Sequence, residues 1–390
     1  MLNFKHYIPT IVYFGKGQVR FIKKELSDRG VTKLLIVTGQ VSVKKNGIFD
    51  AVIKEVKAAR IPYVELSGIK PNPLLKSVYK GIEVCKKENV DFILAVGGGS
   101  VIDAAKAIAA GAKYAGDVWD FFEHKAYPET ALPLGTVLTL AATGSEMNGN
   151  SVVTKEETQR KLAFGCYVVR PIFSILDPEY TYTVDAYNTA AGVADIMVHV
   201  FEQYFSLTPA SEVQDRLSEG LIKVCIKYGP IVVKDPTNYD ARSNILWAGS
   251  LALNSLIGEG KSQDWATHAI EHEVSAIYDI SHGVGLAILS PNWMKHVLSE
   301  KTVDKFVDFG VNVWGIERNK NKMVIAEEAI QKTRIFFTSL GLPSSLSEIN
   351  ISNEHFETMA RGTFDAWGGA VGSFKELVLE DVIKIYEMSL

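Results

Sequence analysis

The chain has 390 residues, of which 47% are hydrophobic and 22% are charged, and its formal net charge at pH 7 is −4. This length can bury a large core and suggests about two domains. The composition is typical of a soluble globular protein. Lysine pairs such as Lys44-Lys45 are short and interleaved with acids, so neither a nucleic-acid track nor a membrane-surface patch is expected.

Neither a membrane-spanning segment nor a secretory signal is evident. Apolar runs such as Phe92–Val96 are far shorter than the roughly 18 residues of a membrane helix, and Met1–Lys5 leads into no signal-peptide core. The three cysteines are odd in number and far apart, which argues against a disulfide framework or a thiolate zinc site. We expect a cytoplasmic protein whose cysteines are small buried residues.

Apolar runs typical of buried strands alternate with helical patterns from residue 1 to about residue 180. This alternation predicts an α/β domain with a mostly parallel sheet flanked by helices. Strands are expected at residues 33–38, 61–66, 91–96, 134–140, 162–169 and 172–176, with helices at 46–59, 73–85 and 101–112. In the second of these helices, Asn72 is expected at the N-cap and Pro73 at the first helical position.

Helical periodicity dominates the rest of the chain. Helices are expected at residues 193–204, 213–228, 246–257, 266–278, 303–313, 324–340 and 380–388. We therefore expect an α/β domain of residues 1–183 and an all-α domain of residues 184–390. No long linker separates the two, and the cleft between such domains is the default location of an active site.

A glycine-rich segment, Gly97-Gly98-Gly99-Ser100, lies between a predicted strand and an alanine-rich helix. Glycines let backbone N–H groups approach a phosphate, and the helix N-terminus adds partial positive charge. Because the pattern is not G-x-G-x-x-G, a structural tight turn explains it equally well. Gly39-Gln40-Val41-Ser42, after the first predicted strand, can form a second side of such a phosphate-binding site. A carboxylate at Gly39 would bind a ribose 2′-hydroxyl and repel a 2′-phosphate, so glycine there is compatible with NADP.

Gly260-Lys261-Ser262 resembles the end of a P-loop. That motif needs a glycine five residues before Gly260, where this chain has Ser255, and the segment follows a helical pattern rather than a strand. An NTPase site is therefore not expected.

Three histidines, His268, His272 and His282, lie close together in the sequence, and Asp195 and His199 are four residues apart. Residues at that spacing share one face of a helix. A lone histidine on an apolar helix is most often a core residue, but this combination favours a metal site. Nitrogen and oxygen donors without thiolate suit Fe²⁺ or Zn²⁺, and Mn²⁺, Co²⁺ or Ni²⁺ can substitute.

His268-x-x-Glu271-His272 also matches the H-x-x-E-H motif of a class of metalloproteases. In that interpretation both histidines bind the metal and Glu271 activates water. It explains neither the glycine segment nor Asp195 and His199. Replacing Glu271 by Gln should abolish a hydrolase, whereas a hydride-transfer enzyme should keep most of its turnover.

Together these motifs resemble the iron-dependent alcohol dehydrogenase family, in particular its NADPH-dependent butanol dehydrogenase and aldehyde reductase branch, over nearly the whole chain. The segments that carry the resemblance are Tyr13-Phe14-Gly15-Lys16-Gly17, Gly97–Asp103, Thr143-Gly144-Ser145-Glu146, Asp195-x-x-x-His199 and Asp264–Gly283. The family implies a Rossmann-like α/β dinucleotide-binding domain, a helical domain and a catalytic metal in the cleft, a dehydroquinate-synthase-like architecture.

The resemblance also implies roles for individual residues. The implied metal ligands are Asp195, His199, His268 and His282. His272 would lie near the metal and nicotinamide as a neutral proton shuttle. The glycine segment would bind the pyrophosphate, and Gly39, Gln40 and Ser42 would form the 2′-phosphate pocket. The other implied cofactor contacts are Asn72, Asp103, Thr139, Leu140, Thr143, Ser145, Lys161 and Tyr180.

The expected function is the interconversion of small primary alcohols, such as butanol, and aldehydes by hydride transfer. The expected cofactors are NADP(H) and Fe²⁺, with Zn²⁺ or another divalent ion possible; the metal would polarise the carbonyl oxygen. Dehydroquinate-synthase-like and glycerol-1-phosphate dehydrogenase-like enzymes are alternatives, but their phosphorylated substrates need clustered Arg and Lys near the metal. A non-enzymatic metal-binding protein would have no use for the glycine segment. Exposed sheet edges favour a homodimer.

Overall fold

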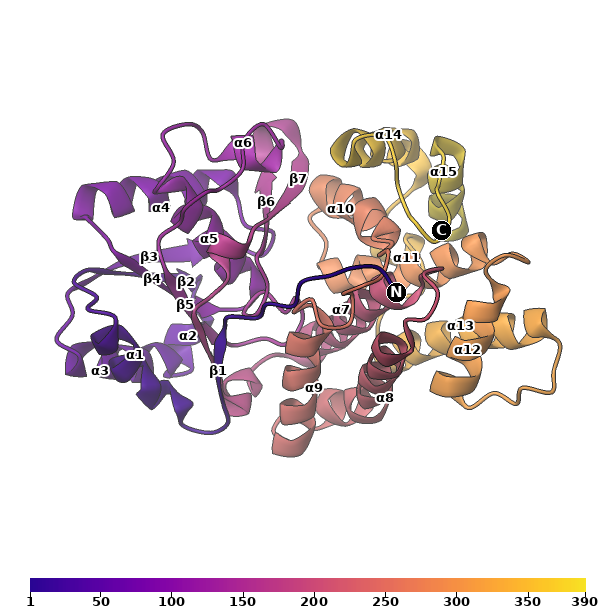
Figure 1. Cartoon of the computed structure of the whole chain (residues 1–390), viewed down its shortest axis with the longest axis horizontal. Coiled ribbons are helices and arrows are strands. Elements are labelled where there is room, and N and C mark those ends of the chain that lie inside the picture. Colours follow the sequence, from indigo (N-terminus) through magenta and orange to yellow (C-terminus); the bar gives the residue numbers. More distant parts are fainter. The chain divides into compact units, whose positions relative to one another are not determined.

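The computed structural model describes residues 1–390, which form two compact units (Figure 1). One unit is Tyr7–Val184, and the other combines Met1–His6 with Asp185–Leu390. The expected boundary, after residue 183, assigned the first residues to the α/β domain. In the structure they pack with the helical unit, because Leu2 N donates to Gly260 O at 2.8 Å and the Met1 ammonium donates to Pro209 O at 2.6 Å.

A single parallel sheet of six strands, in the order β1-β8-β5-β4-β2-β3, forms the centre of the α/β unit. The strands are β1 (Ile11–Phe14), β2 (Leu34–Gly39), β3 (Tyr63–Ile69), β4 (Phe92–Gly97), β5 (Leu134–Leu138) and β8 (Phe173–Leu176). The four strands β2, β4, β5 and β8 are buried along nearly their whole length, as their continuous apolar runs require in a sheet covered on both faces. The predicted α/β class is confirmed.

Two more strands, β6 (Asn150–Lys155) and β7 (Arg160–Gly165), form a separate antiparallel hairpin. The strand expected at residues 162–169 therefore ends early, and Tyr167–Val169 form a 3-10 helix instead. β6 was not expected, because it is short and lacks a long apolar run.

Helices cover both faces of the sheet. In Figure 1, α1 (Phe21–Asp28) and α3 (Ile48–Ala58) lie on one face, and α4 (Leu75–Glu88) and α5 (Gly99–Gly111) lie on the other. α5 is buried at every residue except Ser100, and its small side chains allow α4 to pack closely against it. Two short helices, α2 (Ser42–Lys45) and α6 (Trp119–Phe122), complete the unit.

The expected start of α4 is wrong. The helix begins at Leu75 with Leu74 at the N-cap, so Asn72 is not the cap and Pro73 is not the first helical residue. Thr154 N of β6 donates to Pro73 O at 2.8 Å, and Leu74 forms a parallel bridge with Thr154. This pairing keeps the chain extended for two residues beyond Asn72.

The second unit is helical, as expected. Its helices are α7 (Ala186–Tyr204), α8 (Glu212–Lys234), α9 (Tyr239–Ala252), α10 (Ala266–Tyr278), α11 (His282–Val297), α12 (Val303–Trp314), α13 (Lys322–Ser339), α14 (Phe356–Trp367) and α15 (Leu379–Met388). α7 is central: it is buried from Thr189 to Tyr204 and packs against α8, α9 and α11. The bounds of α10 match the prediction, whereas α9 ends at Ala252, five residues before its predicted end.

Short 3-10 helices lie at Gln18–Arg20, Glu156–Thr158, Tyr167–Val169, Pro178–Thr181, Ser347–Ile349 and Asn353–His355. All three cysteines, Cys85, Cys166 and Cys225, are buried free thiols, as predicted. No helix of either unit combines the length and the apolar character needed to cross a membrane.

Candidate active site

The four expected metal ligands come from three helices of the helical unit. Asp195 and His199 lie one turn apart on α7, His268 lies in the first turn of α10, and His282 is the first residue of α11. The first three are buried, with 2%, 4% and 5% of their surface exposed, and His282 is partly buried. Fold and burial therefore bring together residues that are up to 87 positions apart, the difference between 195 and 282.

The donor atoms gather around one carboxylate oxygen, Asp195 Oδ1. It lies 3.5 Å from His199 Nδ1, 3.8 Å from His282 Nε2 and 4.0 Å from His268 Nε2. Ligands held about 2.1 Å from one ion at tetrahedral angles lie about 3.4 Å apart, so these separations fit one divalent ion.

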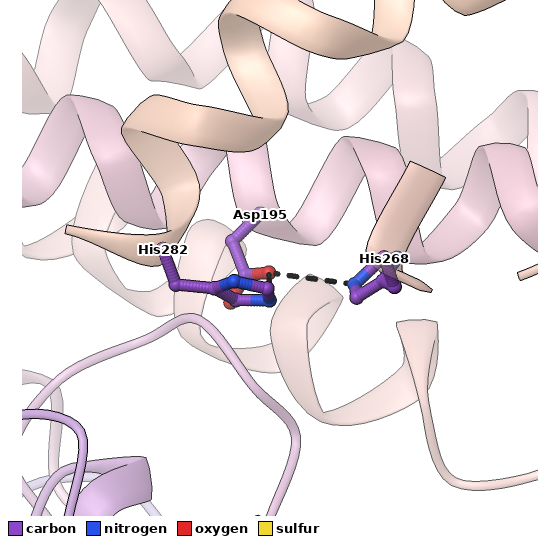
Figure 2. A group of neighbouring side chains, drawn as sticks. All are labelled: Asp195, His268 and His282. Carbon is purple, nitrogen blue, oxygen red and sulfur yellow. Dashed lines mark ion pairs between the residues drawn. The ribbon is translucent and has the colours of Figure 1, made fainter. Parts of the chain in front are cut away.

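The structure groups three of these residues more closely than the fourth. Donor atoms of Asp195, His268 and His282 all lie within 4.8 Å of one another (Figure 2). His199 is outside that group, although its Nδ1 is near Asp195 and its ring stacks on that of His268 at a centroid distance of 4.6 Å.

Two of the histidine nitrogens need a partner that the protein does not supply. His199 Nδ1 and His268 Nε2 are buried and have no hydrogen-bond partner. Leaving buried polar atoms unsatisfied costs free energy. Burial lowers the pKa of His199 well below its ordinary value, and the neighbouring His268 and His282 lower it further, so this ring is neutral and has a lone pair available. The donor set fits a divalent metal ion.

Two buried glutamates contact the expected ligand histidines; the sequence did not identify Glu202, and it identified Glu271 only as part of the protease motif. Glu202 on α7 accepts a hydrogen bond from His268 N at 2.9 Å and lies 2.8 Å from His268 Nδ1. Glu271 on α10 pairs with His282 Nδ1 and accepts a hydrogen bond from the Ser275 hydroxyl. The spacing of Asp195, His199 and Glu202 along one helix face was an available signal for the first of them.

The position of Glu271 does not suit a hydrolase. Its side chain is 0% exposed, and His282 and Ser275 occupy its carboxylate, so it is not placed to activate water. His272 is partly buried, and its ring centroid lies 5.5 Å from that of His282. Replacing Glu271 by Gln cannot distinguish a hydrolase from a hydride-transfer enzyme, because this change also alters the surroundings of His282.

Buried Asp264 holds the segment that leads into α10. Its Oδ2 accepts hydrogen bonds from Ser373 N at 2.8 Å and Phe374 N at 2.7 Å, and its Oδ1 accepts one from Ala266 N at 3.1 Å. Burial, followed by the charge of Glu202, raises the pKa of Asp264 to about 7. This region of the helical unit therefore favours an added positive charge.

Trp265 follows Asp264 with a φ of +65°, a left-handed conformation that is uncommon for residues other than glycine. It is the N-cap residue of α10, and its ring lies 5.2 Å from that of His268. Such conformations cost free energy and are concentrated at functional sites. The strained residue here lies three positions before a candidate metal ligand.

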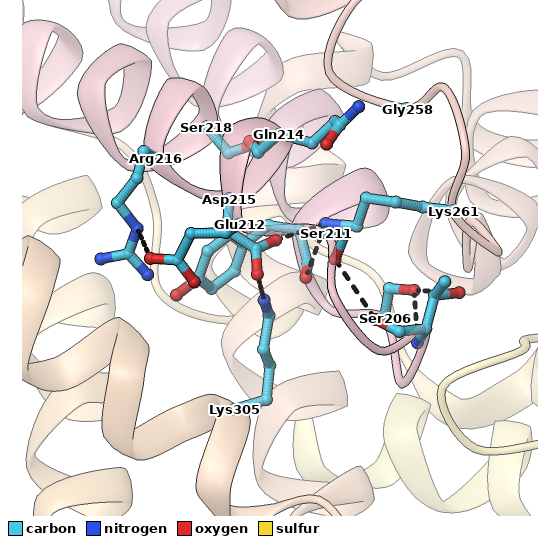
Figure 3. Close-up of polar contacts among 12 residues, drawn as sticks. Ser206, Ser211, Glu212, Gln214, Asp215, Arg216, Ser218, Gly258, Lys261 and Lys305 are labelled. Atoms are coloured by element: carbon cyan, nitrogen blue, oxygen red, sulfur yellow. Dashed lines mark hydrogen bonds and ion pairs between the residues drawn. The ribbon is translucent and has the colours of Figure 1, made fainter. Parts of the chain in front are cut away.

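Gly260-Lys261-Ser262 is not a phosphate loop. Lys261 Nζ lies 2.6 Å from Asp215 Oδ1, and Lys305 Nζ lies 2.6 Å from Asp215 Oδ2 (Figure 3). Burial, followed by the charge of Lys305, lowers the pKa of Lys261 to about 8. This cluster ties the loop that precedes α10 to α8 and α12, so Lys261 has a structural role.

Several of the expected cofactor residues of the α/β unit lie at the carboxyl edge of the sheet. Gly39 ends β2, Gly97 ends β4, and Thr139 follows β5 and donates a backbone hydrogen bond to Gly97 O at 3.1 Å. The neighbouring strands β2 and β4 lie side by side in the sheet. From β2 the chain continues to β3 on one side, and from β4 it continues to β5 on the opposite side, so the strand order reverses between β2 and β4. Ligands of open parallel sheets bind at such switch points.

Two glycines of the glycine segment, Gly97 and Gly99, have no room for a side chain. A Cβ atom at Gly97 would lie 2.6 Å from Val101 Cγ2, and one at Gly99 would lie 2.3 Å from Thr143 Oγ1. α5 starts at Gly99, and no side chain caps its first turn. The structure therefore gives these glycines a packing role and also leaves a helix N-terminus of the kind that binds phosphate.

Two expected cofactor contacts, Asp103 and Ser145, are partners of each other in the structure. Asp103 Oδ1 accepts a hydrogen bond from Ser145 Oγ at 2.5 Å, and Asp103 Oδ2 accepts one from Val152 N at 3.1 Å. The buried ammonium of Lys106 donates to Ser145 Oγ at 2.8 Å and to Asn148 Oδ1 at 3.0 Å. This network supports the loop that follows β5.

The remaining expected cofactor residues differ in exposure. Gln40 and Ser42 are exposed, Lys161 on β7 is buried, and those with intermediate exposure are Asn72, Ser100, Thr139, Leu140, Thr143 and Tyr180. Tyr180 packs against the sheet core, and burial raises its pKa to about 12. Tyr180, which was expected to contact the cofactor, therefore also stabilises the core.

Both halves of the sequence match one protein family. The family model described as "Iron-containing alcohol dehydrogenase" matches residues 9–178, and that described as "Fe-containing alcohol dehydrogenase family, C-terminal" matches residues 189–390. The chain belongs to the iron-containing alcohol dehydrogenase family. The resemblance to this family is confirmed, whereas its NADPH-dependent branch is not tested, and the hydrolase and dehydroquinate-synthase-like enzyme alternatives are not retained.

Relatives within the iron-containing alcohol dehydrogenase family are similar over the full length. The chain is 48% identical to NADH-dependent butanol dehydrogenase A of Clostridium acetobutylicum, with 100% of both sequences covered. It is 36% identical to NADPH-dependent aldehyde reductase YqhD of Escherichia coli, with 99% of both covered. The crystal structure of NADH-dependent butanol dehydrogenase A from Thermotoga maritima matches with a TM-score of 0.96 and 38% identity, covering 100% of this chain and 99% of that one.

Membership of the iron-containing alcohol dehydrogenase family makes the chain an oxidoreductase and implies iron and a nicotinamide cofactor. It does not decide between NAD and NADP, because similar relatives are named for each.

Proposed function

We propose that the protein interconverts small primary alcohols and aldehydes by hydride transfer with NADP(H), using divalent iron held by Asp195, His199, His268 and His282. The observation that supports this most strongly is the convergence of three histidine nitrogens on Asp195 Oδ1, at 3.5 to 4.0 Å. When bound, the metal supplies Lewis acidity that stabilises negative charge on the substrate oxygen. Zn²⁺ or another divalent ion is the alternative metal.

The proposed substrate is small and uncharged. The aromatic ring of Trp265 lies 5.2 Å from the ring of His268. Apolar neighbours favour an uncharged alcohol or aldehyde over a phosphorylated compound. The names of the relatives, butanol dehydrogenase and aldehyde reductase, support the same substrate class.

We assign His272 to proton transfer to and from the substrate oxygen. It lies one turn after His268 on α10, next to the ring of His282, and is partly exposed. An imidazole can take up or release a proton near neutral pH. His272→Ala should lower turnover and change its pH profile, and an unchanged profile with unchanged turnover would remove His272 from the mechanism.

We assign the pyrophosphate of the cofactor to the backbone of Gly97–Ser100 at the start of α5. Gly39 supports NADP(H), because the end of β2 carries no carboxylate to repel a 2′-phosphate, and the hydroxyl of nearby Ser42 is exposed. The proposal for NADP(H) rests on this position, since the named relatives include both an NADH-dependent and an NADPH-dependent enzyme.

Anaerobic purification with metal analysis, followed by oxidation assays with NADPH and NADH on short- to medium-chain aldehydes, tests the proposal. We expect stoichiometric divalent metal, aldehyde-dependent NADPH oxidation, and loss of activity after chelation. Full activity in the metal-free protein contradicts the metal site. A higher kcat/KM with NADH contradicts the cofactor assignment alone.

We also propose a homodimer. β1 and β3 form the two edges of the sheet, and uncovered edges favour association with a second copy. Light scattering should give twice the 42.9 kDa mass of one chain, and the monomer mass would contradict the proposal.

A further inference from the structure

We infer that Glu202 and Glu271 are positioning residues of the metal site: each carboxylate accepts a hydrogen bond from the Nδ1–H of one ligand histidine and thereby presents the Nε2 of that ring to the metal. The inference rests on the proposed function, because it takes His268 and His282 as ligands. It adds two residues that do not themselves bind the metal or the substrate.

Glu202 fixes both the backbone and the ring of His268. The same oxygen, Glu202 Oε1, accepts from His268 N at 2.9 Å and lies 2.8 Å from His268 Nδ1. A neutral imidazole carries one proton, and a proton on the nitrogen that faces the carboxylate leaves the lone pair on Nε2. That Nε2 is buried, has no hydrogen-bond partner and lies 4.0 Å from Asp195 Oδ1.

Glu271 has the corresponding relation to His282. Its Oε2 pairs with His282 Nδ1, while its Oε1 accepts the Ser275 hydroxyl, so the carboxylate is itself held in place. His282 Nε2 lies 3.8 Å from Asp195 Oδ1. Thus two rings on two helices, each paired through Nδ1 with a buried carboxylate, direct Nε2 toward the same oxygen.

Gly285 makes room for the buried carboxylate of Glu271. It lies on α11, one turn after His282, and a Cβ atom there would lie 2.7 Å from Glu271 Cγ and 2.8 Å from Glu271 Oε1. The fold therefore brings α11 against this side chain at a position without a side chain of its own. The pairing of Glu271 with His282 depends on that close approach.

A purely structural role explains these glutamates less well. Buried ion pairs and hydrogen-bonded carboxylates are often no more stabilising than apolar residues of similar volume, so stability alone gives little reason for two of them here. A structural role also does not require both partner rings to direct their second nitrogen to one atom. Carboxylates behind metal-bound histidines fix the tautomer and raise ligand basicity.

A second group of donor atoms, from Glu271, His272 and His282, also lies within 4.8 Å of one another. Under the inference this group does not bind an ion of its own. A second ion there would compete for His282. Because the inference uses Nδ1 of His282 for the hydrogen bond to Glu271 and Nε2 for the ion near Asp195, it leaves no His282 nitrogen for a second ion at this group.

Titration of the metal-free full-length protein with Co²⁺, followed by its visible absorption, tests the inference. The variants are Glu202→Gln and Glu271→Gln, which keep the side-chain size and remove the charge. Glu219→Gln is the matched control, because Glu219 is equally buried, at 3% exposure, and accepts from the Tyr204 hydroxyl at 2.9 Å instead of contacting a ligand. Both test variants should bind Co²⁺ about 10- to 100-fold more weakly and shift its absorption bands, whereas the control should match the wild type.

Several outcomes would overturn the inference. Wild-type affinity and unchanged absorption bands in both test variants would show that the carboxylates do not position the ligands. A wild type that binds no Co²⁺ contradicts the proposed function instead. If neither glutamine variant folds, nitrogen NMR of the Zn²⁺-loaded wild type decides: Nδ1 should be protonated in His268 and His282, and unprotonated Nδ1 atoms overturn the inference.

Discussion

The proposed metal site of the helical unit and the glycine segment of the α/β unit are specified in opposite ways. The first consists of side-chain donors from α7, α10 and α11 that gather around Asp195 Oδ1. The second includes two glycines, Gly97 and Gly99, at which a side chain would collide with Val101 or Thr143. Donor residues at helical spacing indicate chemistry directly, whereas glycines can be explained by packing alone. Substitutions in each region should therefore fail in different ways.

Asp195→Ala should have the largest effect. It removes the oxygen around which the three histidine nitrogens gather, so bound metal should be lost and aldehyde-dependent NADPH oxidation should fall by at least about 10³-fold, from several kcal/mol of lost charge stabilisation. Metal analysis and steady-state assays measure both. NADPH binding, followed by fluorescence, should persist because its expected residues are in the other unit. Wild-type turnover without bound metal would contradict the assignment.

Gly99→Ala should give the opposite result, with metal retained and cofactor binding weakened. The new Cβ would lie 2.3 Å from Thr143 Oγ1, and overpacking of about 1–3 kcal/mol displaces the loop, so the Kd for NADPH should rise about tenfold or more. Gly220→Ala on α8 is the control, because a Cβ there meets no atom within 4 Å. An unchanged Kd for NADPH in Gly99→Ala would show that this segment does not bind the cofactor.

Much of the fold and of the candidate metal site could be predicted from the sequence, because the signals were local. Alternating apolar runs predicted the parallel sheet, and the helix expected at residues 266–278 is α10 to the residue. The spacing of Asp195 and His199 put both on one face of a helix, where the structure has them. α11 was missed because it is buried from Gly283 to Met294 and so shows no polar face.

The partners of the site residues could not be predicted, because they depend on tertiary contacts. Glu271 appeared as a water-activating residue of a protease motif, and only the approach of α11 shows that it pairs with His282. Asp103 and Ser145 appeared as separate cofactor contacts, although they are bonded to each other across 42 positions. Sequence spacing identifies donors on one helix, but not which side chain from another element will meet them.

Gly39→Asp contrasts with Gly99→Ala within the α/β unit, because it adds a negative charge at a glycine beside which there is room for a Cβ atom. A Cβ atom at Gly39 would lie 3.7 Å from Ile69 O and from Val101 Cγ2, which are ordinary van der Waals contacts. Repulsion of the 2′-phosphate should lower the ratio of kcat/KM for NADPH over NADH about tenfold, roughly 1.4 kcal/mol. Gly39→Asn controls for size, and an equal ratio in the two variants would contradict the pocket.

The smallest predicted effect is a pH dependence located in the helical unit. The pKa of Asp264 is raised to about 7, against about 3.9 in an unfolded chain, so the folded protein favours the protonated carboxyl. Its contribution to stability is complete below about pH 4 and is lost as pH rises toward 7, on the order of 1 kcal/mol per pH unit. Thermal midpoints of the metal-free wild type and Asp264→Asn, measured from pH 5 to 8, should therefore show the stability of the wild type relative to the variant falling by a few degrees as pH rises. If the difference in thermal midpoint between the wild type and Asp264→Asn is the same at every pH, Asp264 is not the group that titrates.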